Sequence, residues 1–182
     1  MNRRLAQGLT GDAGDRARPA ARVVVALGAN LGERARTLAE ALIELDRLPL
    51  TRVAGAAEPI ESVAITLAGP DEDAPAYLNT VALLDTSLAP SVLLQYLHAI
   101  EARHGRARRE GEARWQSRTL DLDIVAYGDV RSDDPALTLP HPRAAERDFV
   151  LGPWLAVDPD AVLPGRGRVA DLLAALRAEE TS

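Results

Sequence analysis

The sequence RWQSRTLDLDIVAY, residues 114–127, contains the pattern that decides the fold prediction. Residues 119–127 are predicted to form a β-strand, and successive side chains of a strand point to opposite faces. Asp121 and Asp123 therefore share one face, while the apolar residues between and beside them share the other. Two neighbouring carboxylates favour a cation between them, and oxygen ligands suit a hard divalent cation. The strand thus predicts a metal site backed by a hydrophobic core.

Taken alone, two acids that alternate with leucine more often mark the solvent-exposed face of an amphipathic strand. Arginines upstream favour a site instead, because guanidinium groups bind the phosphates that a metal ion also holds. Phosphoryl transfer needs little from a protein beyond metal ions, positive groups and an aligned nucleophile. The alternative for the arginine-rich segment 106–117 is a flexible surface loop, because Glu110 and Glu112 interrupt its positive charge.

The composition fits one globular domain without thiol chemistry. The chain has 182 residues, of which 47% are hydrophobic, enough for one sizeable core. It has no cysteine, which excludes disulfides, thiolate metal sites and a cysteine nucleophile. Its net charge of -6 argues against a general nucleic-acid binder, because such proteins need a basic surface.

No apolar run is long enough to span a bilayer, and the first residues lack the apolar centre of a signal peptide. We therefore expect a cytoplasmic protein that binds neither membranes nor nucleic acid. Residues 1–21 are expected to form a disordered tail and residues 22–180 a single domain.

The rest of the pattern alternates strands and helices. β-branched and apolar runs predict strands, and leucines three or four residues apart predict helices. In chain order these are a strand at 22–27, a helix from the turn 28–32 up to Pro49, a weaker edge strand at 51–62, a loop at 63–76, a strand at 78–86, a helix from Pro90 to about His104, and the strand at 119–127. Strand-helix-strand occurs twice, which is the split βαβ order of an α+β ferredoxin-like fold, an antiparallel sheet with both helices on one face.

A C-terminal extension follows the second unit. Residues 133–147 are predicted to be a proline-rich loop, residues 148–157 a short helix or strand, and residues 169–177 a helix with inward-facing leucines. The loop contains His141 between two prolines, and such a histidine is on its own more often a loop residue than a ligand.

Two features nearer the N-terminus have structural and functional interpretations. The glycine turn 28–32 is neither a dinucleotide-binding fingerprint nor a P-loop with its lysine, so we assign it the structural role of starting a helix. Tyr77 and Asn79 stand at the start of a predicted strand, where a ring and an amide could bind a flat heterocycle. Aromatic residues near strands are, however, usually part of the core.

Five motifs, in this order and spacing, carry a resemblance to a known family. They are ALGANLG at 26–32, YLNTVALLDTSLAP at 77–90, IEARHGRAR at 100–108, RWQSRTLDLDI at 114–124 and LTLPHPRAAERDFVL at 137–151. The chain resembles the hydroxymethyldihydropterin pyrophosphokinases from about Arg22 to Leu176. The resemblance implies transfer of a pyrophosphoryl group from ATP to 6-hydroxymethyl-7,8-dihydropterin in folate biosynthesis, with release of AMP.

By matching position, the resemblance also implies the roles of individual residues. Asp121 and Asp123 would hold two Mg²⁺ ions that bridge the phosphates of ATP. The residues expected to be catalytic are these two and Arg106 and Arg118. Those expected to bind ATP are His98, Glu101, Arg108, Trp115, Ile124, Leu137, Thr138, His141 and Arg147. Those expected to bind the pterin are Ser62, Tyr77, Asn79 and Phe149.

The chain departs from the family pattern in two places. Trp115-Gln116-Ser117-Arg118 stands where the family usually has Trp-Gly-Pro-Arg, and residues 60–66 (IESVAIT) stand where it usually has Tyr-Glu-Thr-x-Pro-x-Gly. These departures support a second hypothesis, a divergent paralogue that binds a nucleotide or pterin without catalysis. A third hypothesis is a ferredoxin-like interaction domain that binds neither. The leading expectation is an active, monomeric pyrophosphokinase whose partners are small-molecule substrates.

Overall fold

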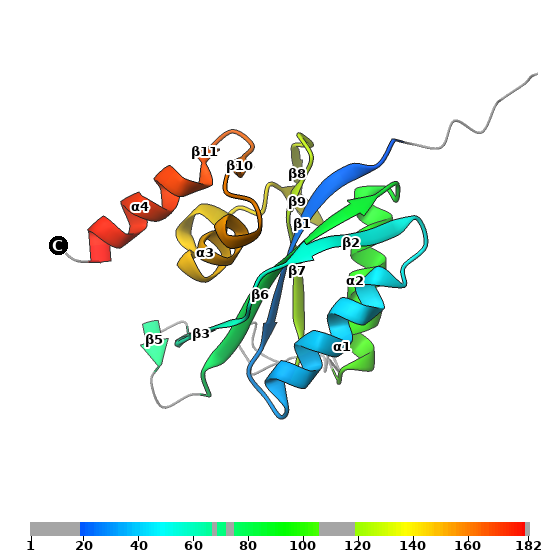
Figure 1. Ribbon diagram of the computed structural model, residues 1–182, viewed down its shortest axis with the longest axis horizontal. Helices are drawn as coiled ribbons and strands as arrows, with labels where there is room; N and C mark the ends of the chain where they lie inside the picture. Colours follow the sequence, from blue (N-terminus) through cyan, green and yellow to red (C-terminus); the bar gives the residue numbers. More distant parts are fainter. Residues whose placement is uncertain (1–18, 67–68, 72–74, 106–118, 181–182) are drawn as a thin grey trace, which may run out of the picture.

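Four strands and two helices form the centre of the computed structural model, which describes residues 19–66, 69–71, 75–105 and 119–180. In chain order they are β1 (Ala21–Ala29), α1 (Arg34–Asp46), β2 (Thr51–Ala56), β6 (Tyr77–Thr86), α2 (Pro90–Arg103) and β7 (Asp121–Tyr127). The strands pair in the order β2-β6-β1-β7, and each of these pairs is antiparallel (Figure 1). The predicted split βαβ, ferredoxin-like α+β fold is confirmed.

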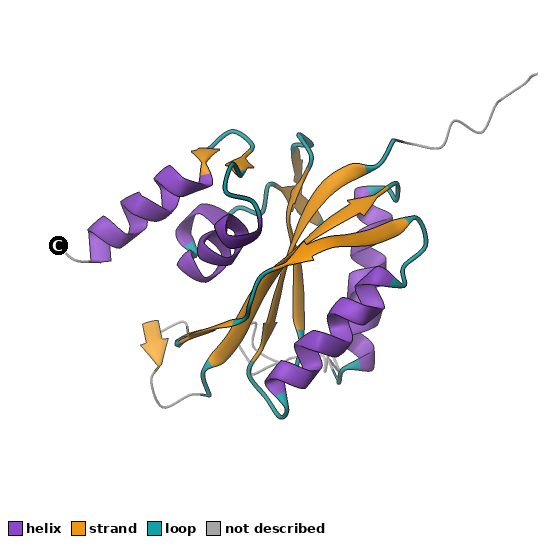
Figure 2. Ribbon diagram, viewed as in Figure 1, coloured by secondary structure: helices purple, strands orange, loops and turns teal. Residues whose placement is uncertain are grey.

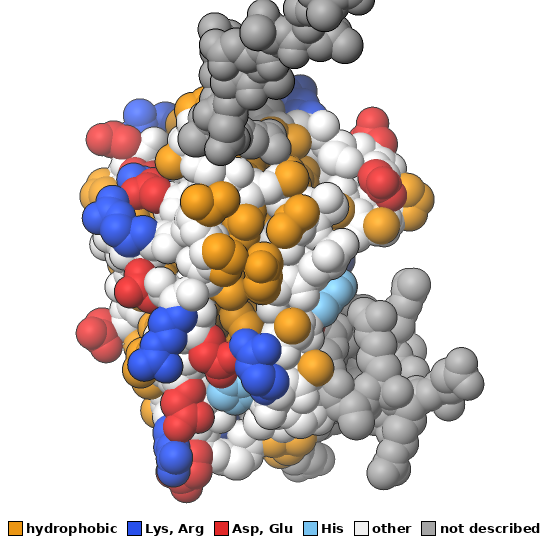
Figure 3. Space-filling view, turned by 90° about the vertical axis from the view of Figure 1, so that its right-hand side faces the viewer, with side chains coloured by type: hydrophobic (Ala, Val, Ile, Leu, Met, Phe, Trp, Pro, Cys, Tyr) orange, Lys and Arg blue, Asp and Glu red, His pale blue; other side chains and the backbone are white. Residues whose placement is uncertain are grey.

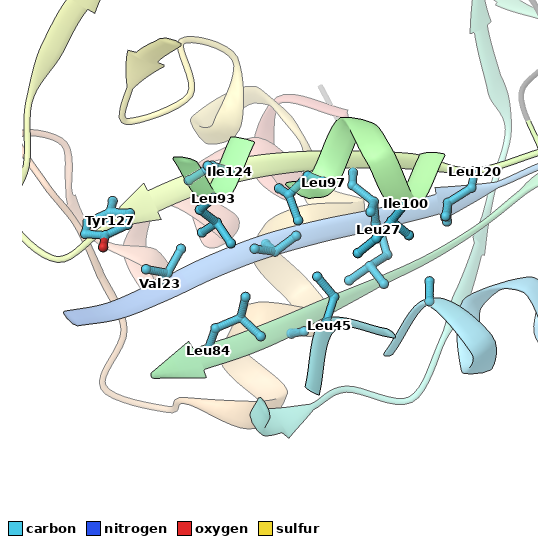
Figure 4. Close-up of a cluster of buried hydrophobic side chains, with 14 of the residues drawn as sticks. Val23, Leu27, Leu45, Leu84, Leu93, Leu97, Ile100, Leu120, Ile124 and Tyr127 are labelled. Carbon is cyan, nitrogen blue, oxygen red and sulfur yellow. The ribbon is translucent and has the colours of Figure 1, made fainter. Parts of the chain in front are cut away.

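One hydrophobic core lies between the sheet and helices α1 and α2. Alternate residues of β1 point into it: Val23, Val25 and Leu27 are all at most 1% exposed. Leucines of both helices reach the same layer, together with Ile124 of β7 (Figure 4). Because burying one such side chain contributes about 1.5–3 kcal/mol, this layer fixes which face of each strand is inside. The two helices of the split motif share one face, as predicted.

The C-terminal extension covers the opposite face of the sheet (Figure 2). It consists of α3 (Asp148–Val157), the short hairpin β10 (Val162–Leu163) and β11 (Gly167–Arg168), and α4 (Val169–Glu180). Trp154 of α3 and Leu173 of α4 pack with Val81 and Leu83 of β6 in a second core. Residues 148–157, left open between helix and strand, form a helix, and the helix predicted at 169–177 is confirmed. The sheet is therefore buried on both faces.

A bulge in β7 turns two successive residues of this strand toward the second core. Its pairing with β1 shifts between Val24 and Val25, so that Val125 is an extra residue without a ladder partner. Ile124 faces α1 and α2, whereas Val125 and Ala126 both belong to the core under α3. The bulge lies after the aspartates, so the predicted alternation of Asp121 and Asp123 with apolar residues is unchanged.

Three segments expected to be simpler contain additional structure. The weak edge strand expected at 51–62, with interruptions at Gly55 and Pro59, is divided into β2 and β3 (Ile60–Ser62), which both pair with β6. The register of β2 shifts at Gly55, and the break contains Pro59, which has no N–H to donate. The loop expected at 63–76 contains the hairpin of β4 (Ala64–Thr66) and β5 (Gly69–Asp71). The loop expected at 133–147 contains β9 (Leu137–Leu139), paired with β8 (Ser132–Asp134), and the short 3₁₀ helix η1 (Ala144–Glu146).

The surface has the mixture of apolar and charged groups usual for a globular protein. The side of the molecule where α1 and α2 lie shows apolar side chains grouped among charged ones (Figure 3). Within the described ranges, no helix is long and apolar enough to cross a membrane. Residues 1–18, and with them most of the predicted tail, lie outside these ranges.

Leu50 gives a test of backbone strain. Its φ angle is 53°, in the left-handed region that disfavours a branched side chain, and the residue is 71% exposed. Because asparagine tolerates this region and little apolar contact is lost, Leu50→Asn should raise the free energy of unfolding by about 0.5–1 kcal/mol. Urea denaturation measures the change. Val162→Asn, at a 55% exposed apolar position with ordinary φ, is the control and should bring no gain.

Candidate active site

The register of three strands places polar side chains in one row across the sheet. Gly28 of β1 lies opposite Asn79 of β6 on one side and opposite Asp121 of β7 on the other. Residues that pair across a ladder point to the same face. Asp121 precedes Leu122, which faces α1 and α2, so the row lies on the face that α3 covers farther along the sheet. An amide and a carboxylate therefore flank the central strand on one surface.

Gly28 keeps this surface open. It lies inside β1, and a Cβ atom on it would be 3.0 Å from Oδ1 of Asn79 and 3.7 Å from Cδ1 of Tyr77. The assignment of this glycine to a helix-starting turn is wrong in that respect, because the turn begins only after Ala29. A glycine within a strand run is a signal for close approach of another group, and it could have identified Gly28 as a site residue.

Asn79 also connects to the neighbouring edge of the sheet. Its Nδ2 donates to Oγ of Ser62 at 2.8 Å, and the Asn79 side chain is buried. Ser62 is the last residue of β3 and lies opposite Tyr77. The sequence-predicted pterin residues Ser62, Tyr77 and Asn79 are thus brought together. The altered segment at 60–66 still presents a hydroxyl to the amide, because β3 pairs in register with β6.

Asp123 is joined by two residues from the segment between β9 and α3. Its Oδ2 is 3.5 Å from NH1 of Arg147 and 3.9 Å from Nε2 of His141. The backbone N–H of His141 donates to the carbonyl of Val125 at 2.8 Å, which fastens this segment to the bulge of β7. The side chains of Arg147 and Asp123 are 20% and 38% exposed, so a ligand can reach both of them. His141 and Arg147, both expected at the phosphate-binding site, therefore lie beside the strand that carries the aspartates.

The surroundings of His141 favour one tautomer of its neutral ring. Burial lowers its pKa; Asp123 opposes that shift, and the positive charges of Arg147 and Arg143 add to it. Its Nδ1 accepts the backbone N–H of Arg143 at 3.2 Å. The neutral ring therefore carries its proton on Nε2, the nitrogen that faces Asp123. That N–H is suited to donate to an anion bound beside the aspartates.

Phe149 completes the surface on the side of α3. It is the second residue of that helix and is partly buried, with the guanidinium carbon of Arg147 lying 5.8 Å from the centre of its ring. The helix lies beside β3, the strand that ends in Ser62. An aromatic ring from the extension is therefore added to the face that holds Tyr77 and Asn79.

The five residues expected near the nucleoside gather around the sheet edge beyond β7. They are His98 and Glu101 of α2, Ile124 of β7, and Leu137 and Thr138 of β9. The three elements contact one another, although Ile124 is only 3% exposed. Arg106, Arg108, Trp115 and Arg118, like the departure at Gln116 and Ser117, lie outside the described residues.

Glu101 connects α2 to the strand that bears the aspartates. It is fully buried, and its Oε1 accepts the backbone N–H of Leu122 at 2.9 Å. β7 is an edge strand, and this N–H lies between Asp121 and Asp123 in the chain. The buried carboxylate therefore satisfies a strand-edge donor and fixes the position of the acid pair relative to α2.

The acid pair fits magnesium bound together with phosphates. Within the described residues, no group of three or more histidine and acidic side chains could hold a metal ion by itself. Magnesium commonly uses one or two carboxylates and takes its remaining ligands from water and substrate phosphates. Asp121 and Asp123, on one face beside Arg147, match that requirement.

Fold and site together define a ferredoxin-like α+β domain with a metal-compatible carboxylate pair. The family model of 7,8-dihydro-6-hydroxymethylpterin-pyrophosphokinase (HPPK) matches residues 24–159, more than half of the chain. The chain belongs to this family, as its motifs predicted.

Two relatives support the same family. The chain is 44% identical over 154 residues to the 2-amino-4-hydroxy-6-hydroxymethyldihydropteridine pyrophosphokinase of Pseudomonas aeruginosa, covering 85% of this chain and 91% of that protein. It is 36% identical over 149 residues to the protein of the same name from Haemophilus influenzae, covering 82% and 89%.

A solved structure supports the fold. The wild-type HPPK-DHPS of Plasmodium falciparum matches with a TM-score of 0.68 at 12% identity, over 92% of this chain and 43% of that chain. This chain thus spans less than half of that protein, and the likeness concerns the fold.

A side chain at position 28 should disturb the row across the sheet. Gly28→Ala forces Oδ1 of Asn79 to move, because the new Cβ would lie 3.0 Å away. We expect a loss of about 1 kcal/mol in the free energy of unfolding, measured by urea denaturation. Gly55→Ala in β2 is the matched control, since no atom of the described residues beyond its chain neighbours lies within 4 Å of its Cβ position, and it should lose no stability. Equal losses at both positions would contradict the close approach at Gly28.

Replacing Glu101 should separate loss of the acceptor from loss of charge. Glu101→Leu leaves the buried N–H of Leu122 without its acceptor and should lower the free energy of unfolding by about 1–3 kcal/mol. Glu101→Gln keeps an oxygen at the same place and should lose less. Thermal and urea denaturation of both variants measure this difference. A glutamine variant as unstable as the leucine variant would refute the importance of this hydrogen bond.

Proposed function

We propose that this chain transfers the pyrophosphoryl group of ATP to 6-hydroxymethyl-7,8-dihydropterin, giving AMP and the pterin methyl diphosphate for tetrahydrofolate biosynthesis. The observation that carries the proposal is the register that sets Asn79, Gly28 and Asp121 in one row on one face of the sheet. This row would bring a polar ring bound at Asn79 next to a metal-bound polyphosphate at Asp121. The names of the relatives agree with this assignment.

The phosphate half of the site would be formed by β7 and the segment before α3. Asp121 and Asp123 would hold two magnesium ions, which supply charge neutralisation for the polyphosphate. Arg147 and the Nε2–H of His141 both lie beside Asp123 and would donate to phosphate oxygens. Arg106, Arg118, Arg108 and Trp115 are assigned to the same half by matching position.

The pterin half would be formed by β3, β6 and the start of α3. Asn79, held by Ser62, would hydrogen-bond the polar edge of the ring system. Tyr77 and Phe149 would lie against its faces, because flat heterocycles stack on aromatic rings. The open surface above Gly28 would leave room for the ring.

Reaction follows from holding the two ligands in line. The hydroxyl oxygen of the pterin forms a bond to the β-phosphorus and gives up its proton to solvent. The bond from that phosphorus to the α–β bridging oxygen breaks, and AMP leaves with the electron pair. The side chains of both halves would orient the reactants and exclude water rather than form covalent intermediates. His98, Glu101, Ile124, Leu137 and Thr138 are assigned to the nucleoside side, and the burial of Glu101 favours an indirect contribution through β7.

The non-catalytic paralogue and the interaction domain are less favoured, because the acid pair, Arg147 and the Asn79–Ser62 bond are all in place. We further propose one domain over residues 22–180 preceded by a tail, a monomer and a cytoplasmic location. Size-exclusion chromatography with light scattering and cell fractionation test the last two.

The decisive assay measures AMP formed from ATP and the pterin alcohol in the presence of magnesium. We expect AMP that depends on the pterin and disappears on chelation with EDTA. AMP no higher than in a reaction without pterin would refute the proposal. Calorimetry that then showed ATP binding without pterin binding would support the non-catalytic paralogue.

Asp123→Ala tests the metal assignment. It removes one of two metal-binding carboxylates that face the phosphates and should lower kcat by about 100-fold or more. The control is Asp129→Ala, which removes an exposed carboxylate from the turn after β7 and should leave kcat unchanged. Circular dichroism checks that both variants are folded. A near-normal rate in the Asp123 variant would overturn the assignment.

A further inference from the structure

Arg34 is placed where helix electrostatics are unfavourable. It is the first residue of α1, and the N-terminus of a helix carries partial positive charge. The first turn of α1 contains no acidic residue, and the acidic residue at this end of the helix, Glu33, is its N-cap. A basic side chain at this position does not stabilise the helix through its dipole. Its stabilising contacts lie with other segments of the chain.

Those contacts join two segments that are distant in sequence. NH1 of Arg34 donates to the backbone carbonyl of Ala76 at 2.7 Å, and NH2 donates to Oε1 of Glu61 at 2.8 Å. Glu61 is the middle residue of β3, and Ala76 directly precedes β6. One guanidinium group at the N-terminal end of α1 thus bridges both chain segments. This end of α1 and the start of β6 lie at the same end of the molecule (Figure 1).

The bridged residues are immediate neighbours of two residues assigned to the pterin. Ser62 follows Glu61, Tyr77 follows Ala76, and Ser62 and Tyr77 are the last pair of the β3–β6 ladder. Beyond this pair the chain continues into the connection 63–76, which joins β3 to β6. Arg34 therefore fastens the ladder at the end where this long connection leaves it.

We propose that Arg34 is a positioning residue for the pterin half of the site. It holds Ser62 and Tyr77 at a fixed distance from each other and from α1, and through Ser62 it holds the amide of Asn79. This role rests on the pyrophosphokinase proposed above, whereas the bridge itself is independent of it. Arg34 touches neither the reacting atoms nor the acid strand, so it acts on binding of the ring rather than on the phosphoryl transfer.

The two hydrogen bonds of Arg34 differ in strength. The side chain of Glu61 is 65% exposed, so its ion pair with Arg34 is largely screened by solvent. The bond to the carbonyl of Ala76 is partly buried and comes from a charged donor, which makes it the stronger contact. Arginine can serve both acceptors at once through its planar fork, and lysine, with a single ammonium group, cannot reproduce this geometry.

The test uses the full chain with Arg34→Ala, Arg34→Lys and Arg36→Ala. Arg36 is the matched control, because it lies on the same helix, is 74% exposed and, among the described residues, bonds to Glu40 alone, one turn along α1. We expect Arg34→Ala to raise KM for the pterin about 10-fold while KM for ATP stays within about two-fold. Arg34→Lys should fall between wild type and alanine, Glu61→Gln should change KM for the pterin less than Arg34→Ala, and Arg36→Ala should change neither constant.

Two further measurements separate positioning from loss of fold. Removing a positive charge from the start of α1 relieves an unfavourable interaction, so the melting temperature of Arg34→Ala should stay close to that of wild type. Amide hydrogen exchange should become faster at residues 60–62 and 77–79 in Arg34→Ala but not in Arg36→Ala. An unchanged KM for the pterin, or equal increases in both KM values, would overturn the positioning role.

The outcome for Arg34 is distinguishable from the outcome for the proposed function. If the wild-type chain forms no AMP, the pyrophosphokinase proposal fails, and hydrogen exchange still decides whether Arg34 holds the end of the ladder. If the wild type is active and exchange in Arg34→Ala is unchanged, the bridge is refuted while the function stands.

Discussion

The pairing of β1 with both β6 and β7 is the constraint on which the site depends. Because β1 is central, one residue of it, Gly28, sets the positions of Asn79 on one side and Asp121 on the other. A shift of one residue in either ladder would turn the whole set of side chains to the opposite face. The two hydrophobic cores make such a shift costly, since it would expose buried residues of β1 on both sides. Apolar packing on both faces of the sheet therefore fixes the geometry of the polar row.

The C-terminal extension contributes to both stability and site. By covering the second face of the sheet, it buries Val81 and Leu83, which an isolated split βαβ unit would expose. The same segment carries His141, Arg147 and Phe149 and fastens them through the hydrogen bond to Val125. Its packing and its polar contacts are thus one arrangement. Loss of the core under α3 would also remove the positive charge of Arg147 from beside Asp123.

Much of the fold could be predicted because it depends on local patterns. Alternation in β1, β6 and β7 and the leucine spacing of both central helices are direct consequences of strand and helix periodicity. The interruption at Pro59 could be expected from the local sequence, but the separate strand β3 could not, because it depends on pairing with β6. Gly28 was misassigned for a related reason: a glycine at the end of an apolar run is compatible with a turn or a strand, and the ladder partners decide between them.

The sequence by itself determined the order of elements, the shared face of Asp121 and Asp123, and the motifs that identify the family. Only the tertiary structure decided that Ser62 bonds Asn79, that Glu101 holds the strand between the aspartates, and that Arg34 bridges Glu61 and Ala76. The physical reason is range. Periodicity is a property of neighbours along the chain, whereas these contacts join residues that are distant in sequence and meet only after strand register and core packing have been fixed.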